Sequence, residues 1–271
     1  MSIADQAESQ INQSIRLTDS DGKPKSQSTL LTEIGRTFDL FHDRDLAAFA
    51  EIRTEVAAEV WPIRSDGFKR HLSARFFELT KRGFNRNSYL DARDTLEAWA
   101  INAGRTEDVF LRVANLGSRI YIDICDDGWR VIEVCGSGWK ILNHSPVRFV
   151  RKNGMSSLPT PIENGNIDLL RHLVNIDGSR GHLELLVGWM LAALRGNGPY
   201  PILVLQGEQG TGKSTTSAHI RAFIDPSTVP LRSPPRDPKD LLVSASNNHL
   251  VVLDNLSGLS PCLLYTSPSP R

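Results

Sequence analysis

A glycine-rich stretch between an apolar run and a helical pattern restricts this chain more than any other feature. Residues 202–205 (ILVL) form a continuous apolar run, which is typical of a strand buried on both faces of a sheet. The stretch QGEQGTGKS follows directly, and TTSAHIRAFI then continues with helical spacing. Gly207 to Ser214 fit the pattern GxxxxGK[ST] in full. This order of strand, glycine loop and helix predicts an α/β fold whose loop binds phosphate.

Each residue type in this loop has a chemical reason. Glycines let the backbone turn sharply, so that its amides point at phosphate oxygens, and the positive end of the next helix adds to the attraction. Lys213 supplies a charge for the β and γ phosphates, and Ser214 supplies a hydroxyl ligand for Mg²⁺. We therefore expect ATP and Mg²⁺ to bind here, the alternative being a coincidental glycine-rich turn. The expected nucleotide-binding residues are Gly207, Glu208, Gln209, Gly210, Thr211, Gly212, Lys213, Ser214 and Thr215.

A second apolar run, residues 250–253, ends in Asp254. In phosphate-loop proteins, an aspartate at the end of the neighbouring strand usually binds Mg²⁺ together with the hydroxyl of the loop. Ser214 and Asp254 are therefore the expected metal ligands. Lys213, Asp254 and Asn255 are the expected catalytic residues. Asn255 stands where many motor ATPases carry a glutamate. Because an amide orients water but cannot take its proton, the sequence leaves open whether Asn255 supports hydrolysis. Three basic residues between the two motifs either sense nucleotide or a neighbouring subunit, or are exposed loop charges: Arg232, Arg236 and Lys239.

Composition and hydrophobic period divide the rest of the chain. Residues 1–28 are polar, with few large apolar side chains, and predict a disordered leader. Residues 29–151 predict an α+β domain with short strands, two helices and an antiparallel meander. Residues 152–166 are rich in Gly, Pro, Ser and Asn, as in a linker. Residues 167–261 then hold the loop, preceded by the apolar helix HLELLVGWMLAALR, which we expect to be buried.

The overall charge is balanced, with 31 basic and 31 acidic residues, so any DNA contact must come from a local patch. One basic cluster lies on and after a predicted helix. It is a candidate for contact with phosphates, and the alternative is a solvated helix face. Its members are Lys69, Arg70, Arg75, Lys81, Arg82 and Arg86. The 3 cysteines lack CxxC spacing, and the chain has no signal-like segment and no long apolar run. These features predict a cytoplasmic protein without a membrane partner.

The runs LVLQGEQGTGKST and IDPSTVPLRSPPRDPKDLLVSASNNHLVVLDNLSGLS resemble the ATP-binding proteins of prophages and integrated elements that are related to superfamily 3 helicases. The similarity covers most of residues 38–260. It implies an incomplete P-loop NTPase core of AAA+ type behind an α+β domain, ring-shaped homo-oligomers with ATP between subunits, and DNA as a partner. It also implies that Gly207, Gly212, Lys213 and Ser214 bind phosphate and metal, and that Asp254 binds Mg²⁺.

The implied function is that of a phage or mobile-element ATPase that acts as a DNA helicase or primase-associated motor. Two alternatives stay open. The first is a nucleotide-dependent switch or defence-type ATPase that moves no DNA. The second is a small-molecule kinase that uses the same loop.

The end of the chain carries a different signal. The resemblance implies a polar sensor and an arginine finger after the strand of Asp254, and neither follows it. Residues 262–271 (CLLYTSPSPR) are what a transposase-based sequencing adaptor encodes in one reading frame. We therefore expect this tail to be adaptor-derived and the chain to be a truncated fragment with little or no hydrolysis. The alternative is a natural terminus rich in proline and serine.

Overall fold

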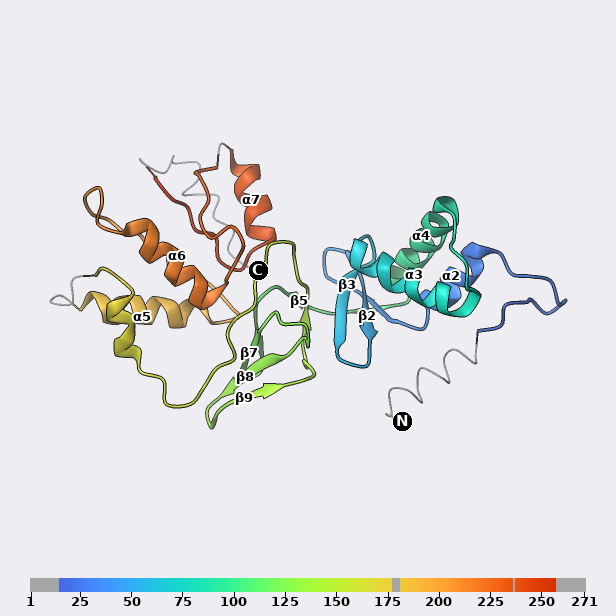
Figure 1. The fold of residues 1–271 in the computed structure, drawn as a ribbon, viewed down its shortest axis with the longest axis horizontal. Coiled ribbons are helices and arrows are strands. Elements are labelled where there is room, and N and C mark those ends of the chain that lie inside the picture. Colours follow the sequence, from blue (N-terminus) through green and yellow to red (C-terminus); the bar gives the residue numbers. More distant parts are fainter. Residues whose placement is uncertain (1–14, 177–180, 236, 257–271) are drawn as a thin grey trace. The chain divides into compact units, whose positions relative to one another are not determined.

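A computed structural model describes residues 15–176, 181–235 and 237–256. The described chain forms two compact units. The first comprises residues 15–109 and 148–150, and the second comprises the described residues of 110–147 and 151–256. Figure 1 labels the elements of both. The expected adaptor-derived tail, residues 262–271, lies outside the described residues.

The first unit is a four-stranded sheet covered on one face by helices (Figure 1). The strand order is β3-β2-β1-β4, in which β1 pairs in parallel with β4 and the other neighbours are antiparallel. Alternate residues of β1 and β2, including Leu40, Ala50 and Ile52, join helix residues in one apolar core. The elements are α2 (Gln27–Gly35), β1 (Asp39–His42), β2 (Ala48–Arg53), β3 (Ala58–Pro62), α3 (Asp66–Thr80), α4 (Arg86–Asn102) and β4 (Arg105–Thr106).

The spacing of apolar residues explains α3 and α4. Phe68, Leu72 and Phe76 recur every four residues and are all buried, so one face of α3 packs on the core. The side chain of Ser65 accepts a hydrogen bond from the amide of Phe68, and that of Asn85 caps α4 in the same way. The sequence prediction of short strands followed by two helices in this part of the chain is confirmed.

The prediction that the disordered leader extends to residue 28 is wrong over residues 15–28. Thr18 and Pro24 form an antiparallel bridge, and the carboxylate of Asp19 accepts hydrogen bonds from the amides of Asp21 and Lys23. The helix α2 then begins at Gln27. Such side-chain contacts to nearby amides order a polar turn without apolar burial, which composition does not register. Residues 1–14 lie outside the described residues.

The second unit contains the predicted antiparallel meander. Its strands pair in chain order, and they are β6 (Val113–Leu116), β7 (Arg119–Asp123), β8 (Val131–Cys135) and β9 (Gly138–Leu142). The later segment PVRFV is not a strand of this meander. It instead forms β10 (Arg148–Phe149), which pairs with β5 (Val109–Phe110).

The predicted linker at residues 152–166 begins just after the point where the chain last leaves the first unit, at Val150. The chain first leaves that unit at Val109, however, and returns only for residues 148–150, so the meander belongs with the glycine-rich loop and not with the preceding helices. The physical reason is a buried ion pair. Arg112, next to β6, is 0% exposed and bonds to Asp225 at the end of the helix that follows the loop.

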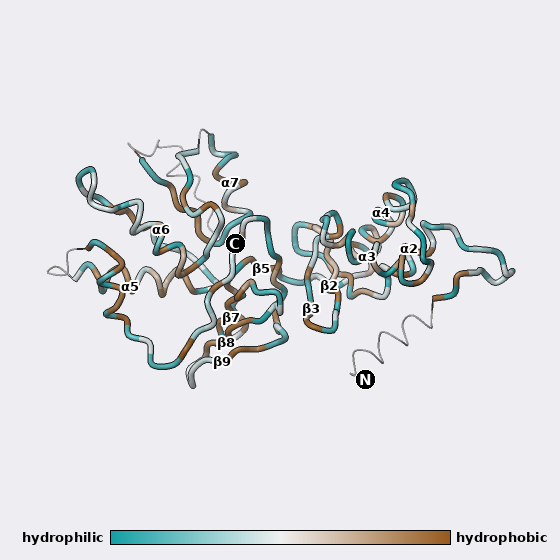
Figure 2. The backbone as a smooth tube through the Cα atoms, viewed as in Figure 1, coloured by the Kyte–Doolittle hydropathy of each residue, from teal (hydrophilic) through white to brown (hydrophobic). Residues whose placement is uncertain are grey.

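The remaining elements of this unit pack around a smaller apolar core. They are η1 (Ile167–His172), α5 (His182–Ala193), α6 (Lys213–Ile224) and α7 (Pro238–Ser246). Leu170, Val174, Leu186, Ile220 and Ile224 are at its centre. Figure 2 shows apolar residues along α5.

Two expectations about this core are corrected. The helix α5 is not buried all round, because Leu185 is 71% exposed while Leu186 is buried. Residues 202–205 form no strand in the described structure: Ile202 and Val204 are 64% and 62% exposed, whereas Leu203 and Leu205 pack on the core. This run therefore buries one face only. Residues 250–253 likewise form no regular strand and make a single parallel bridge.

Candidate nucleotide-binding site

The glycine-rich loop turns as its composition predicts. Gly210 and Gly212 have φ of 83° and 79°, in the left-handed region that other residues rarely adopt. At Gly207 a β-carbon would lie 2.9 Å from the hydroxyl of Thr211, so a side chain there would displace this neighbour. That hydroxyl donates to the carbonyl of Glu208 and closes the turn at 2.8 Å. The loop is therefore a compact turn that ends where α6 begins.

The start of α6 is open to an anion. Gly212 occupies the N-cap position and provides no side-chain acceptor for the first amides of the helix. By contrast, α2, α3, α4 and α7 are capped by the side chains of Ser26, Ser65, Asn85 and Asp237. The first turn of α6 therefore keeps amide donors and the positive end of the helix dipole available for phosphate oxygens.

Lys213 is folded back over the loop. Its ammonium group donates to the carbonyl of Gly207 at 2.9 Å and to that of Glu208 at 2.6 Å. These bonds hold the ammonium group over the turn. Lys213 is also the residue that the sequence predicted to contact phosphate. The structure thus brings Gly207, Glu208, Thr211, Gly212 and Lys213 together in one loop.

The two predicted metal ligands meet although 40 positions separate them. The hydroxyl of Ser214 donates to a carboxylate oxygen of Asp254 at 2.8 Å. A hydroxyl and a carboxylate are the kind of oxygen ligands that Mg²⁺ takes from proteins, which usually give it one or two ligands and leave the rest to water and phosphate. These residues therefore fit the ion and are the ones that would hold it.

Backbone pairing places Asp254. The amide of Arg232 donates to the carbonyl of Val252 at 3.0 Å, and the amide of Asp254 donates to the carbonyl of Arg232 at 2.9 Å. These bonds form a parallel bridge between Arg232 and Leu253. Arg232 thus contributes backbone contacts, and its role in sensing nucleotide stays a prediction. Arg236 lies outside the described residues.

The other predicted residues lie at the margin of the site. Gln209 is exposed in the turn, and Thr215 is exposed in the first turn of α6. Asn255 is also exposed and has φ of 56°, so it follows Asp254 in a left-handed conformation that asparagine tolerates. No hydrogen bond of the Asn255 side chain is found within the described residues.

Sequence reasoning missed Asn175. Its side-chain amide donates to the carbonyl of Thr211 at 2.9 Å, and its backbone amide donates to the hydroxyl of Thr216 at 3.4 Å. It therefore holds the loop and the first turn of α6 from outside. A lone asparagine 36 positions before the residue that it contacts carries no motif that would have identified it.

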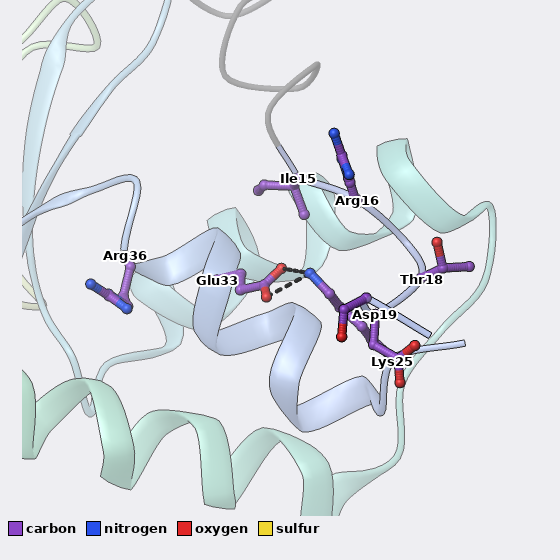
Figure 3. Close-up of a pocket in the computed structure, with 8 residues that line it drawn as sticks. Ile15, Arg16, Thr18, Asp19, Lys25, Glu33 and Arg36 are labelled. Carbon is purple, nitrogen blue, oxygen red and sulfur yellow. Dashed lines mark hydrogen bonds and ion pairs between the residues drawn. The ribbon is translucent and has the colours of Figure 1, made fainter. Parts of the chain in front are cut away.

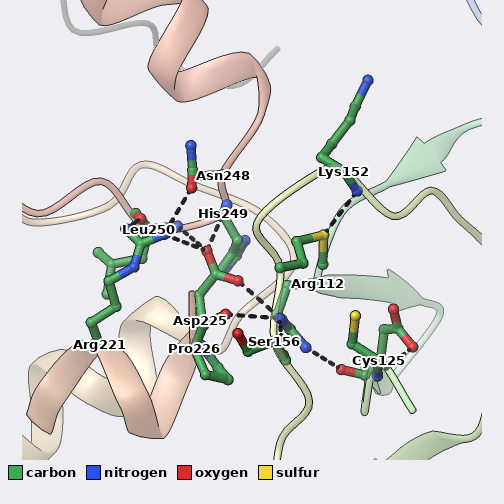
Figure 4. A network of polar contacts seen from close by, with 12 residues as sticks. Arg112, Cys125, Lys152, Ser156, Arg221, Asp225, Pro226, Asn248, His249 and Leu250 are labelled. Atoms are coloured by element: carbon green, nitrogen blue, oxygen red, sulfur yellow. Dashed lines mark hydrogen bonds and ion pairs between the residues drawn. The ribbon is translucent and has the colours of Figure 1, made fainter. Parts of the chain in front are cut away.

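A buried polar network lies at the C-terminal end of α6 (Figure 4). Arg112 donates to Asp225 at 3.0 Å and to the carbonyls of Asp123 and Ser156 at 3.0 and 2.9 Å. The second carboxylate oxygen of Asp225, which is 2% exposed, accepts from the amides of His249 and Leu250 at 3.1 Å each. The network therefore joins the end of α6 to the segment that leads to Asp254.

Arg221 belongs to the same network. Its guanidinium donates to the carbonyl of Leu250, and to the side chain of Asn248 at 2.7 Å. Burial lowers the pKa of Arg221 from its ordinary value, while the charge of Asp225 opposes this shift. Two bonds from α6 thus fix residues 248–250.

A separate hollow of about 530 Å³ lies in the first unit (Figure 3). Lys25 crosses it and donates to both carboxylate oxygens of Glu33 at 2.7 Å. Its lining residues are Ile15, Arg16, Thr18, Asp19, Ser20, Lys25, Glu33 and Arg36. The hollow contains no residue of the glycine-rich loop, and its central charges already satisfy each other.

Residues 167–266 match the sequence model of a family described as actinomycete integrative conjugative element replication protein. The matched segment includes both the glycine-rich loop and Asp254, and it runs into the expected tail. It covers less than half of the chain. No curated protein shows significant similarity to the chain. This part of the chain is therefore similar to replication proteins of mobile elements, as the sequence resemblance predicted in its coarser form. The described residues include no helix long and apolar enough to cross a membrane.

Proposed function

We propose that this chain is the nucleotide-binding part of a mobile-element replication ATPase, and that the full protein acts as a DNA helicase or primase-associated motor. The loop Gly207–Ser214 binds the phosphates of ATP, and Ser214 and Asp254 bind Mg²⁺. The similarity of residues 167–266 to a replication family supports the biological setting.

The observation that carries this proposal is the hydrogen bond between Ser214 and Asp254 at 2.8 Å. A loop sequence alone predicts a phosphate site, but a magnesium nucleotide site also needs a carboxylate beside the loop. The second motif supplies that carboxylate from 40 positions away. A coincidental glycine-rich turn would have no reason to meet the end of the second apolar run.

A P-loop NTPase core of AAA+ type is our proposal for the fold of this part. The parallel bridge between Arg232 and Leu253 supports it, because parallel neighbours around the metal-binding strand are typical of such cores. The one-sided burial of residues 202–205 is compatible with a strand whose other face has no cover among the described residues.

Titration with a fluorescent ATP analogue in the presence of Mg²⁺ tests the proposal. Lys213→Ala removes the charge for the β and γ phosphates and should abolish detectable binding. Lys23→Ala removes an exposed lysine of the first unit and should leave binding unchanged. Equal affinity of both variants and the unchanged chain would refute the loop assignment.

Asn255 favours a second candidate, a nucleotide-dependent switch that moves no DNA. An amide after Asp254 orients water but cannot accept its proton, so hydrolysis would be slow. Phosphate release measured with and without single-stranded DNA separates the two. A replication motor predicts that single-stranded DNA stimulates ATP hydrolysis, whereas a switch predicts no stimulation.

A further inference from the structure

An exposed basic surface surrounds the turn between α3 and α4. Between Lys69 and Arg86 the chain has six basic residues and one acidic residue, Glu78. Arg75 pairs with Glu78 at 3.4 Å, which leaves the other cations of this segment as a group. We define the α3–α4 surface by Lys69, Arg70, Phe77, Lys81, Arg82 and Arg86, all of which are exposed.

The cations of the α3–α4 surface differ from most other charges of the first unit. Arg44, Arg64 and Arg105 each pair with a carboxylate. Within the described part of the chain, by contrast, no carboxylate lies within ion-pair distance of the surface's five cations. Uncompensated charges on one side of a neutral chain create the local positive potential that an anionic polymer requires.

An exposed aromatic ring lies among these charges. Phe77 is 56% exposed, and the ammonium group of Lys81 lies 5.8 Å from the centre of its ring. Lys69 lies eight positions earlier on α3, about 12 Å along the helix axis. Its ammonium group lies 5.4 Å from the ring of Tyr89. The surface therefore offers an exposed aromatic ring beside Lys81, with Lys69 farther along the same helix.

The turn that carries these residues is held firmly. Phe84 packs edge-on against Phe76, with ring centres 5.4 Å apart, and stacks on Tyr89 at 5.9 Å. The backbone amide and the side chain of Asn85 both donate to the side-chain oxygen of Gln27, at 2.9 and 3.0 Å. Since the backbone beside the cations is already ordered, binding a partner costs little additional entropy.

We propose that the α3–α4 surface binds single-stranded DNA. Lys81, Arg82 and Arg86 contact the phosphates, and Phe77 stacks on a base. Stacking on Phe77 favours single-stranded over double-stranded DNA, because paired bases do not present their faces to a protein side chain. This inference rests on the proposed replication function and supplies its DNA contact, but the surface is remote in sequence from the nucleotide loop and needs no ATP.

Fluorescence anisotropy with a labelled oligothymidylate of about 20 nucleotides, at several salt concentrations and without ATP, tests this. The combined variant Lys81→Ala, Arg82→Ala and Arg86→Ala should bind more weakly. It should also lower the slope of log K against log salt by about 2, since each lost phosphate contact contributes about 0.7. Phe77→Ala should weaken binding about tenfold and leave the slope unchanged.

The matched control removes three exposed cations elsewhere in the same unit, by Arg16→Ala, Lys23→Ala and Arg44→Ala. It should bind as the unchanged chain does, and circular dichroism checks that all variants fold. No binding by the unchanged chain, or equal loss in both triple variants, would overturn the proposal. So would equal binding of a duplex without any effect of Phe77→Ala. Because Lys213→Ala should not alter this binding, failure of the ATP site and failure of the DNA surface are distinguishable.

Discussion

At the residue scale, the site depends on a few side chains and on two glycines with left-handed backbone. Gly210 and Gly212 let the loop turn without strain, and Lys213 and Ser214 then begin α6 with their polar groups directed at the loop and at Asp254. Most of this chemistry is local in sequence, which is why the motif predicted it. The contact of Asn175 is not local and was not predicted.

Gly212→Ala tests the requirement for a left-handed backbone. The substitution should cost about 1–2 kcal/mol of stability and weaken ATP binding, because the loop must give up the turn that places its amides. Gly117→Ala is the matched control, since Gly117 has φ of 60° in the β6–β7 turn, with open space around it. It should cost a similar amount of stability. If it weakened ATP binding equally, the effect of Gly212→Ala would reflect stability alone.

His249 gives the second unit a pH dependence. Burial lowers its pKa from the ordinary value of 6.5, and the contribution of Arg112 acts in the same direction against those of Ala193 and Asp225. The folded protein therefore binds fewer protons than the unfolded chain below that value. Stability should be fully present above about pH 6.5 and decline as the pH falls towards the lower, folded pKa.

Thermal unfolding between pH 7.5 and 5 measures this decline, and His249→Gln should make it shallower. The variant keeps a donor for the carbonyl of Ala193, which the ring nitrogen contacts at 2.8 Å. An identical pH profile for variant and unchanged chain would show that His249 is not the responsible group.

At the scale of elements, the spacing of apolar residues predicted the helices and strands that depend on residues close in sequence. The helices α3 and α4 and the strands β6 to β9 followed from apolar spacing and turn glycines, because one buried face determines each of them. The partner of β10, the unit boundary and the one-sided burial of residues 202–205 did not follow. They depend on contacts between distant positions, and a local pattern does not say which partner covers a face.

The pair of Arg112 and Asp225 illustrates such a contact, across 113 positions. Arg112→Met should destabilise the second unit by about 3–5 kcal/mol, because it leaves a buried carboxylate without its cation. Urea unfolding measures the change. Arg171→Met removes an exposed partner of Asp168 in the same unit and should cost less than about 1 kcal/mol. Similar costs for both variants would contradict the role of the buried pair.

At the scale of the whole molecule, two units carry different chemistry. The second unit holds the loop and Asp254, and its segment 167–266 is similar to replication proteins of mobile elements. The first unit carries the unpaired cations of the α3–α4 surface. The total charge does not indicate this surface, since 31 acidic residues offset 31 basic ones over the whole chain. Charge distribution, and not net charge, therefore identified the nucleic-acid contact that we propose.

The Mg²⁺ dependence of ATP binding, measured by calorimetry for Ser214→Ala, Asp254→Asn and the double variant, tests whether these two side chains bind one metal ion. If both side chains bind one ion, Mg²⁺ should strengthen ATP binding to the unchanged chain. Each single variant should lose most of that gain, and the double variant should lose little more than the worse single variant, because contacting residues are not additive. An unchanged Mg²⁺ effect in all three variants would contradict the shared site.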